Sequence, residues 1–569
     1  MRGWDDDPEL ADIGPQSIYK VVRQLKKDDH GPYNCLASIV ADAAFVRDVR
    51  RRYPTLPVFA NLRCGLWYVD PNDRNDDHVS RQAASGGDSN NDDDDDAVGT
   101  CYFKSTDGHC NNWSFSATRL NVHVAEAAAT RGGCVVVDAT RSSTKRFPDS
   151  FSKTIPVWAE TISRAVARRR GIVPPTVDDD DESINPESSH RSTWGSGPHL
   201  PVWVGDNERA SIASRMPHFE ETLHAVLHDT DVLDALASKL TKPLRCVWVS
   251  RENEHSLPCV DNMSDLDFTP VVLVTASEPM QRHGERRTGE GGVPYAYIPG
   301  AGDDEESWAR GLTPAVFWAH KESVLGPNGS GGCAAIVDRI VKKTRGNEGA
   351  WTRGVTNDED EGEDSAHLAP RGCLSPNERA ALSRGSLPLG AGGVRRLVSN
   401  GGVSLALGSV HALALEATWD AVDAVLYVGE DLPPLPPDSA RWRHPESVDG
   451  DGETATGIYP APFLHAPMRY AKVARRDVAD GLEACLAFIR ANSARGGGTT
   501  LVACKDGVDH CVGVVVAALI DDDDDESEHS VSKDGVRRRL ADVARVHPEC
   551  RPSRGTLKQV FNRMFEMRR

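Results

Sequence analysis

Residues 346–393 divide the chain into two parts, because they carry no apolar periodicity from which a packed helix or strand could be built. The stretch contains the acidic run Asp358–Asp364 and is otherwise rich in Pro, Gly, Ser and Arg, a composition typical of linkers. We therefore expect a large N-terminal domain over residues 1–345, a disordered linker over 346–393, and a compact C-terminal domain over 394–569.

The C-terminal part alternates short apolar strings with longer helical patterns, which indicates an α/β fold. Expected strands are Val403–Leu407, Ala424–Val428 and Thr499–Cys504, and expected helices are Arg476–Asn492, Val512–Ile520 and Val536–Val546. In the N-terminal part, Gly133–Asp138 reads as a buried strand that ends in an acid. The fold class expected is a mixed α/β, or α+β, two-domain protein.

The net charge of -20 over 569 residues is concentrated in short acidic runs, so it does not exclude a nucleic-acid partner. The remainder of the chain is close to neutral. The runs are Asp92–Asp96, Asp178–Glu182, Asp358–Asp364 and Asp521–Glu526. Those outside the linker predict acidic surface insertions near residues 85–96, 174–190 and 521–532.

The 13 cysteines are scattered, with no C-x-x-C pair and no zinc-finger spacing, which favours a reducing compartment. The longest apolar run, Val512–Ile520, is far shorter than the roughly 20 residues of a membrane span. The N-terminus has no apolar stretch of the kind found in signal peptides. We expect a cytoplasmic protein with no membrane contact and no stable protein partner.

A strand, a short glycine-containing loop and a helix start follow one another around Cys504, an arrangement that binds anions through backbone N–H groups. The layout is that of the cysteine-phosphatase loop with Cys504 as the nucleophile, but His510 stands where a phosphatase needs Arg. The carboxylates of Asp506 and Asp509 in this loop would also repel a phosphate dianion. Anion binding without hydrolysis is therefore favoured over phosphatase activity, and plain core packing stays open. The candidate binding residues are Cys504, Lys505, Asp506, Gly507, Asp509 and His510.

Three segments of the N-terminal part carry polar residues that a plain core would not choose. The first runs from Lys104 to His109, the second follows the strand ending at Asp138, and the third contains Asp303 and Asp304. An acid at a strand end, followed by hydroxyls and cations, suits a sugar-phosphate ligand with magnesium. The alternatives are a turn for the first segment, an ordinary loop for the second, and helix N-capping for the third.

Ten strings in this order resemble the initiator-tRNA 2′-O-ribosyl phosphate transferase family, over almost the whole chain apart from the acidic insertions. Among them are Asn61-x-Arg63-Cys64-Gly65-Leu66-Trp67-Tyr68, Tyr102-Phe103-Lys104-Ser105-Thr106-Asp107-Gly108-His109, Pro148-Asp149-x-x-Ser152-Lys153-Thr154, Gly300-Ala301-Gly302-Asp303-Asp304 and Cys504-x-Asp506-Gly507-x-Asp509. The resemblance implies an N-terminal domain particular to the family and a C-terminal domain like dual-specificity phosphatases.

The resemblance also implies a reaction: transfer of ribosyl 5-phosphate from phosphoribosyl pyrophosphate to the 2′-hydroxyl of adenosine 64 in the T-stem of initiator methionine tRNA, which excludes that tRNA from elongation. Such chemistry needs cations for the leaving pyrophosphate and a base for the hydroxyl. We expect Asp107 or His109 to be the base, Asp138 with Asp303 or Asp304 to place Mg²⁺, and Lys104 to act at the catalytic centre. Donor phosphates would be held by Lys104, Ser105, Thr106, Asp138, Thr140, Arg141, Lys145 and Lys153.

Duplex RNA would be bound through its backbone and wide minor groove. The residues expected to contact tRNA are Arg164, Arg168, Arg169, Arg170 and Arg554, although basic helical faces are often only solvated. Two rival functions remain: a phosphatase-like enzyme and a non-catalytic tRNA-binding protein.

Overall fold

The computed structural model describes residues 31–71, 98–142, 145–172, 194, 197–227, 231–253, 265–278, 285–289, 292–326, 329–349, 395–398, 403–433, 436, 459–469, 474–494, 498–522 and 531–568. Of the expected linker, only residues 346–349 are described, as the end of α12 (Gly329–Gly349). The expected insertions near 85–96 and 174–190 lie outside the described residues, as do residues 523–530 of the third.

The N-terminal domain is built on a sheet of five parallel strands in the order β2-β1-β3-β5-β4. β3 and β5 are buried along their whole length, as expected for central strands covered on both faces. The predicted strand ending at Asp138 is thereby confirmed. The bounds are β1 Val58–Asn61, β2 Gly99–Cys101, β3 Cys134–Asp138, β4 Leu244–Val249 and β5 Thr269–Thr275.

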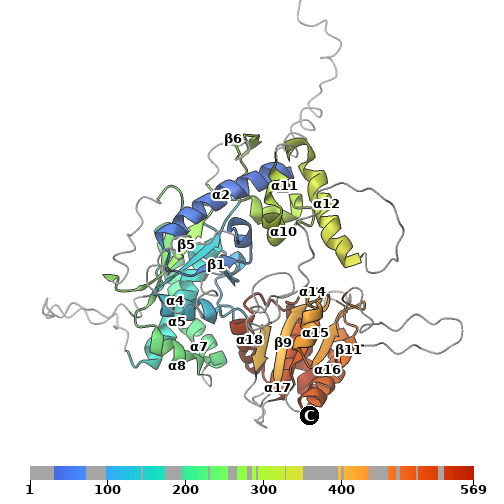
Figure 1. Cartoon of the computed structure of the whole chain (residues 1–569). Helices are drawn as coiled ribbons and strands as arrows, with labels where there is room; N and C mark the ends of the chain where they lie inside the picture. The colour runs from blue at the N-terminus through green and yellow to red at the C-terminus, as the bar shows by residue number, and fades with distance from the viewer. Residues whose placement is uncertain are drawn as a thin grey trace, which may run out of the picture.

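Helices cover both faces of this sheet. Successive side chains of a strand point to opposite faces, so neighbouring residues contact different helices. Val135 and Val137 of β3 pack with α2 and the helices from α10 to α12, whereas Val136 packs with α4, α5, α7 and α8 (Figure 1). The helix bounds are α2 Pro32–Arg52, α4 Val122–Arg131, α5 Ile155–Arg169, α6 Asp206–Ala213, α7 Met216–Leu227, α8 Val232–Lys239, α9 Glu305–Trp308, α10 Pro314–Ala319 and α11 Lys321–Leu325.

Short elements fill the connections of the N-terminal domain. They are the 3₁₀ turns η1 Gly65–Tyr68, η2 Ser105–Gly108 and η7 Ala301–Asp304, the π-helical turn η3 Ser150–Thr154, and the antiparallel pair β6 Arg286–Thr288 and β7 Pro294–Ala296. Several of these turns stand at the carboxyl ends of the parallel strands, where they carry most of the polar segments singled out in the sequence.

The C-terminal domain contains a second five-stranded sheet, in the order β11-β10-β12-β9-β8, parallel except for the edge strand β8. The strands are β8 Arg395–Val398, β9 Ser404–Ser409, β10 Ala424–Val428, β11 Phe463–Ala466 and β12 Thr500–Cys504. The helices are α14 Val410–Leu413, α15 Glu416–Ala421, α16 Asp477–Ser493, α17 His510–Asp521, α18 Lys533–Val546 and α19 Arg554–Met567. The three predicted strands and three predicted helices of this part are confirmed, with ends shifted by a few residues.

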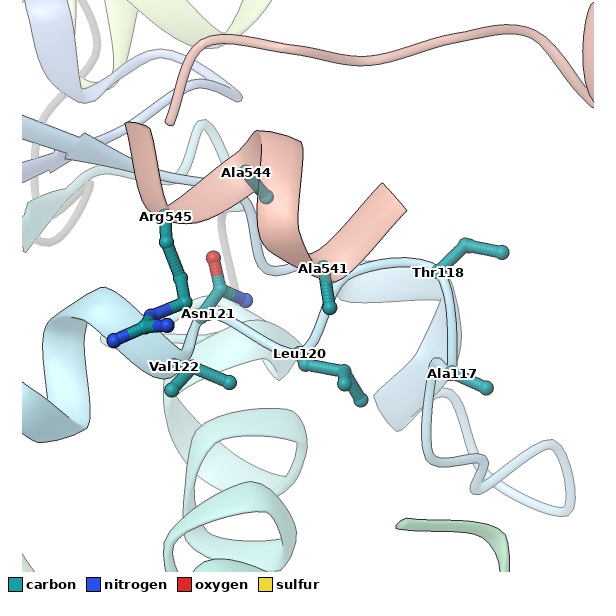
Figure 2. Close-up of a pocket in the computed structure, with 8 residues that line it drawn as sticks. All are labelled: Ala117, Thr118, Leu120, Asn121, Val122, Ala541, Ala544 and Arg545. Atoms are coloured by element: carbon teal, nitrogen blue, oxygen red, sulfur yellow. The ribbon is translucent and has the colours of Figure 1, made fainter. Parts of the chain in front are cut away.

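Helix α18 joins the two domains. Nε of Arg538 donates a hydrogen bond to the carbonyl oxygen of Val226 at 3.1 Å, and Arg545 forms an ion pair with Glu126 at 2.8 Å. Ala541 of α18 belongs to the same apolar cluster as buried residues of α4, α5, α7 and α8. Figure 2 shows α18 lying over the segment 117–122, with a small pocket between them lined by Ala117, Thr118, Leu120, Asn121, Val122, Ala541, Ala544 and Arg545.

Candidate functional site

The carboxyl ends of β1, β2 and β3 meet at one edge of the N-terminal sheet. β1 lies between β2 and β3, so the strand order reverses at β1. Open α/β sheets bind ligands at the carboxyl ends of the strands beside such a reversal. Asn61 at the end of β1 donates from Nδ2 to Oδ2 of Asp138 at 2.9 Å and to the carbonyl oxygen of Phe103 at 3.0 Å. One amide side chain thus joins all three strand ends.

Arg63 lies between two carboxylates at this edge. Its Nε is 3.1 Å from Oδ2 of Asp138, and its Nη1 pairs with Oδ1 of Asp303. Burial alone would lower the pKa of Arg63, but the charges of Asp138, Cys64 and Asp303 together outweigh burial, so the pKa lies above its ordinary value. Burial raises the pKa of Asp303, and the charge of Arg63 offsets part of that rise.

Asp138 itself is wholly buried, and both of its oxygens already have donors. Oδ2 accepts from Ser150 Oγ at 3.1 Å, and Oδ1 accepts from Cys64 Sγ and from the backbone N–H of Ala139, both at 2.9 Å. A carboxylate with this set of donors has no free oxygen directed at a ligand.

The expected magnesium site at Asp138, Asp303 and Asp304 is not supported by this geometry. Oδ2 of Asp303 accepts the backbone N–H of Arg141 at 3.1 Å, and Asp304 pairs with the guanidinium of Arg141. These carboxylates are therefore neutralised by arginines instead of being gathered around a vacant centre. No group of three or more His, Cys, Asp or Glu side chains suited to a metal ion occurs among the described residues.

Asp149 is the centre of a second cluster, made by the loop before η3. Its Oδ2 accepts from Lys145 Nζ at 2.5 Å, and its Oδ1 lies 3.2 Å from Lys153 Nζ. Nε2 of His109 is 3.8 Å from the same carboxylate. Burial raises the pKa of Asp149, but the hydrogen bond from Lys145 and the charge of Lys153 outweigh burial, so the net pKa lies below its ordinary value. Lys153 is buried and also contacts Glu208 at 3.2 Å.

The segment from Lys104 to His109 packs directly on this cluster through η2. Thr154 Oγ1 donates to the carbonyl oxygen of Lys104 at 3.0 Å. A side chain at Gly108 would come within 2.6 Å of the carbonyl oxygen of Asp149, so only glycine permits this close approach. The alternative of a turn is therefore correct for the backbone, since Ser105–Gly108 forms a 3₁₀ turn, although no side chain caps it.

The polar side chains of η2 differ in exposure. Ser105 Oγ is buried and has no hydrogen-bond partner in the described part of the chain. Thr106 is exposed, Asp107 is half-buried, and the His109 ring is 53% exposed. Thr140, in the neighbouring loop, uses its hydroxyl to accept the N–H of Ser142 at 3.2 Å. An orphaned hydroxyl beside an exposed imidazole and two lysines can accommodate a phosphorylated, hydroxyl-bearing ligand.

The Cys504 loop of the C-terminal domain is occupied by its own carboxylate. Oδ1 of Asp506 accepts from Cys504 Sγ at 3.2 Å and from the N–H of Val508 at 3.0 Å, and Cys511 Sγ lies 3.2 Å from Cys504 Sγ. Gly507 adopts a positive φ of 73°, which few other residues tolerate. The thiol and the backbone donor that would face a phosphate are thus directed to Asp506.

The remaining loop residues serve their own domain or face solvent. Oδ1 of Asp509 accepts from the N–H of Ser553 at 2.9 Å and from Thr556 Oγ1 at 2.7 Å, which fixes the start of α19. His510 is buried, whereas Lys505 is exposed. These contacts support packing of α17 against α19 more directly than they support anion binding.

The arginines expected to contact tRNA at the end of α5 are largely engaged within the protein. Arg164 pairs with Glu160 at 2.7 Å, Arg168 contacts Glu220 at 3.5 Å, and Arg169 holds Asp234 through two hydrogen bonds of 2.5 and 2.6 Å. Arg170 donates to the carbonyl oxygens of Ala237 and Leu240 at 3.3 and 2.9 Å, at the end of α8. These contacts argue against this string as a phosphate-binding surface. Arg554 is exposed at the start of α19.

The structure also assigns contacts to residues that were not among the candidates. Three of them form ion pairs in the clusters described above, namely Arg63, Asp149 and Glu208. A fourth, Arg119, acts through its charge on Lys104. Asp149 had a usable signal, because lysines stand four residues before and after it. The sequence signal for Arg63 was weaker, because it was only a cation just after a buried strand.

Comparison with known proteins gives two family matches. The model described as the Rit1 N-terminal domain matches residues 25–84 and 89–342, and the one described as the Rit1 DUSP-like domain matches residues 462–564. The phosphatase-like fold expected for the C-terminal domain is thereby confirmed, within a mixed α/β protein.

Two curated relatives were found. An uncharacterised protein of Schizosaccharomyces pombe is 37% identical over 304 residues, 53% of this chain and 55% of that protein. The tRNA A64-2'-O-ribosylphosphate transferase of Saccharomyces cerevisiae is 29% identical over 322 residues, 54% of this chain and 53% of that protein. The chain thus spans about half the length of the curated relatives it matches.

Among solved structures, human DUSP28 is 20% identical and covers 31% of this chain and 95% of its own, with a TM-score of 0.22. A mouse dual-specificity phosphatase complexed with zinc tungstate is likewise 20% identical, covers 30% of this chain and 86% of its own, and has a TM-score of 0.21.

Proposed function

The chain belongs to the Rit1 family, whose N-terminal model covers more than half of it, and from that premise we propose that it is a tRNA-modifying transferase. In this proposal it moves ribosyl 5-phosphate from phosphoribosyl pyrophosphate to the 2′-hydroxyl of adenosine 64 in initiator methionine tRNA. The name of the Saccharomyces cerevisiae relative supports the nucleotide and the group transferred.

The observation that carries the proposal is the Asp149 cluster. Two lysines from the β3–α5 connection and a histidine from the turn after β2 converge on one carboxylate at the carboxyl edge of a parallel sheet. Lysines are suited to phosphate oxygens, and a histidine is suited to moving the proton of a hydroxyl. The buried hydroxyl of Ser105 adds a donor that has no partner within the described protein.

The transfer makes one bond and breaks one. The 2′-oxygen of the acceptor forms a bond to C1 of the ribosyl group while the bond from C1 to the pyrophosphate oxygen breaks. Pyrophosphate leaves with the electron pair, and the 2′-hydroxyl proton passes to a base. In this step Lys145 and Lys153 stabilise the charge that develops on the leaving group.

His109 is the better of the two expected bases. When it takes the proton it becomes an imidazolium, and the carboxylate of Asp149 at 3.8 Å stabilises that positive charge. The Asp107 backbone is tied into the turn, since its N–H donates to Lys104 and its carbonyl accepts from Ser114. Both residues stay candidates, and His109 is the one that has an orienting partner.

Magnesium enters this proposal with the co-substrate, because pyrophosphate oxygens bind Mg²⁺ readily and the protein carboxylates nearby are already paired with arginines. Arg141, held by Asp304, stands at the same edge and is assigned a binding role towards the donor.

The test is to incubate the full chain with phosphoribosyl pyrophosphate, Mg²⁺ and initiator tRNA, and to measure released pyrophosphate and the mass of each tRNA nucleoside. We expect pyrophosphate and a ribosyl-phosphate-bearing adenosine in equal amounts. His109→Gln should lower the rate by about 10²- to 10⁴-fold, the usual worth of a general base, while tRNA binding is unchanged. His218→Gln, an exposed histidine on α7, is the matched control. Pyrophosphate release without a modified adenosine would contradict the proposal.

A further inference from the structure

Three cations from the two domains gather beside the candidate site. Lys104 follows β2, and Arg119 belongs to the segment 117–122 that α18 covers in Figure 2. Arg554 is the first residue of α19 in the C-terminal domain. The N-terminal domain therefore supplies two of the charges and the C-terminal domain the third.

The ring of Tyr102 orients the two N-terminal cations. The guanidinium of Arg119 lies 4.7 Å from the ring centroid, and Nζ of Lys104 lies 6.0 Å from it. Nε of Arg119 is buried without a hydrogen-bond partner in the described part of the chain. An arginine held over an aromatic ring keeps its planar face fixed and leaves its donors for another group.

The charges of Arg119 and Arg554 both act on Lys104. Burial lowers the pKa of Lys104, the charges of Arg119 and Arg554 lower it further, and the charge of Asp107 opposes them. Arg119 also acts on Cys550 of the C-terminal domain, whose pKa burial raises to about 12 and Arg119 partly lowers. The charge of Arg119 thus acts on groups of both domains.

Such an arrangement is unfavourable without an anion. Within the described ranges, none of the three side chains forms an ion pair with a carboxylate, in contrast to Arg63, Lys145 and Lys153 at the same edge. Lys104 and Arg119 are half-buried, so water screens the repulsion on them only in part, and a phosphate placed among the three charges removes that cost. Arginine guanidinium groups bind phosphate oxygens through paired, parallel hydrogen bonds.

We infer that Lys104, Arg119 and Arg554 form a phosphate-binding cluster that is completed only when the C-terminal domain is docked. The inference rests on the proposed function, because it takes the phosphate to come from the RNA backbone or from the ribosyl donor. It also gives the phosphatase-like domain a role that its Cys504 loop, closed by Asp506, does not provide.

The test uses the full chain with Arg119→Met, which keeps an apolar stem over Tyr102, and Arg554→Glu. Arg563→Glu is the matched control, since it makes the same charge change on α19 about two and a half turns further along, where the side chain pairs with Glu483. Two dissociation constants are measured, neither of which depends on the transfer reaction. One is for initiator tRNA at two salt concentrations, and the other is for inorganic pyrophosphate with Mg²⁺.

If the phosphate belongs to RNA, Arg119→Met and Arg554→Glu weaken tRNA binding about tenfold and reduce its salt dependence, with pyrophosphate binding unchanged. If it belongs to the donor, pyrophosphate binding weakens by a similar factor and tRNA binding does not. Both affinities within twofold of those of Arg563→Glu would overturn the inference. A wild-type chain that binds tRNA through these residues but transfers nothing would refute the proposed function and leave the cluster intact.

Discussion

Arg63 and Asp138 form an ion pair in which Nε lies 3.1 Å from Oδ2, and this pair fastens the loop after β1 to the end of β3. Asp138 is fully buried, whereas Arg63 keeps 20% of its side chain exposed. The arginine also reaches Asp303, so one guanidinium holds three segments of the N-terminal domain at the candidate site.

Removal of this arginine should destabilise the N-terminal domain strongly. Arg63→Met leaves Asp138 as a buried and unpaired carboxylate, for which a loss of about 3–5 kcal/mol in the free energy of unfolding is expected. The double variant Arg63→Met with Asp138→Asn should recover part of that loss, because no charge is then stranded. Urea unfolding followed by tryptophan fluorescence measures both. A single variant as stable as wild type would contradict the assigned pairing.

The buried Asp42 on α2 should make stability depend on pH. Tyr297 donates to its Oδ1 at 2.7 Å and Arg251 lies 3.7 Å away, but burial dominates and raises its pKa to about 7. The folded chain then binds this proton more tightly than the unfolded chain, whose carboxyl has the ordinary pKa of 3.8. The contribution of Asp42 to stability therefore falls as pH rises from about 4 to about 7, and is constant above that range.

Asp42→Asn isolates this effect, because the amide oxygen can still accept from Tyr297. Relative to wild type, the variant should gain stability between pH 4.5 and pH 7.5, by a few kcal/mol at most at about 1.4 kcal/mol per pKa unit. Chemical unfolding at several pH values gives the difference directly. A difference that does not change with pH would show that Asp42 titrates normally.

Cys504 should be dispensable for transfer. Its thiol donates to Asp506, and a carboxylate at that place would repel both a thiolate and a phosphate. Cys504→Ser is expected to keep the transfer rate within roughly threefold, since the loop takes no covalent part. A loss above about a hundredfold would instead indicate a covalent intermediate. The wild-type chain should also fail to hydrolyse a generic phosphatase substrate.

Arg170 should matter for stability and not for RNA. It donates two hydrogen bonds to carbonyl oxygens at the end of α8, so Arg170→Ala should cost about 1 kcal/mol in the free energy of unfolding. The affinity of the Arg170→Ala variant for initiator tRNA should stay within twofold of wild type. A large loss of tRNA affinity with no loss of stability would restore the role expected from the sequence.

Strands and helices of both domains follow from local patterns, since the runs Cys134–Val137 and Ala424–Val428 are apolar throughout and are typical of central strands. The pairing of Arg63 with Asp138 and Asp303 does not follow in the same way. It joins positions 75 and 240 residues apart, and depends on strand order that periodicity does not encode. The partners of Arg168, Arg169 and Arg170 are likewise distant in the sequence, because they lie on α7 and at α8. None of the described helices is long and apolar enough to cross a bilayer.

Transfer of ribosyl 5-phosphate to the initiator tRNA alone is tested most directly by comparing two methionine tRNAs. Phosphoribosyl pyrophosphate labelled in the ribose is supplied with Mg²⁺ to the full chain and to initiator and elongator methionine tRNAs in parallel. The account predicts label on adenosine 64 of the initiator and none on the elongator. Label on neither tRNA, with initiator binding intact, would contradict the account and leave a tRNA-binding protein without transferase activity.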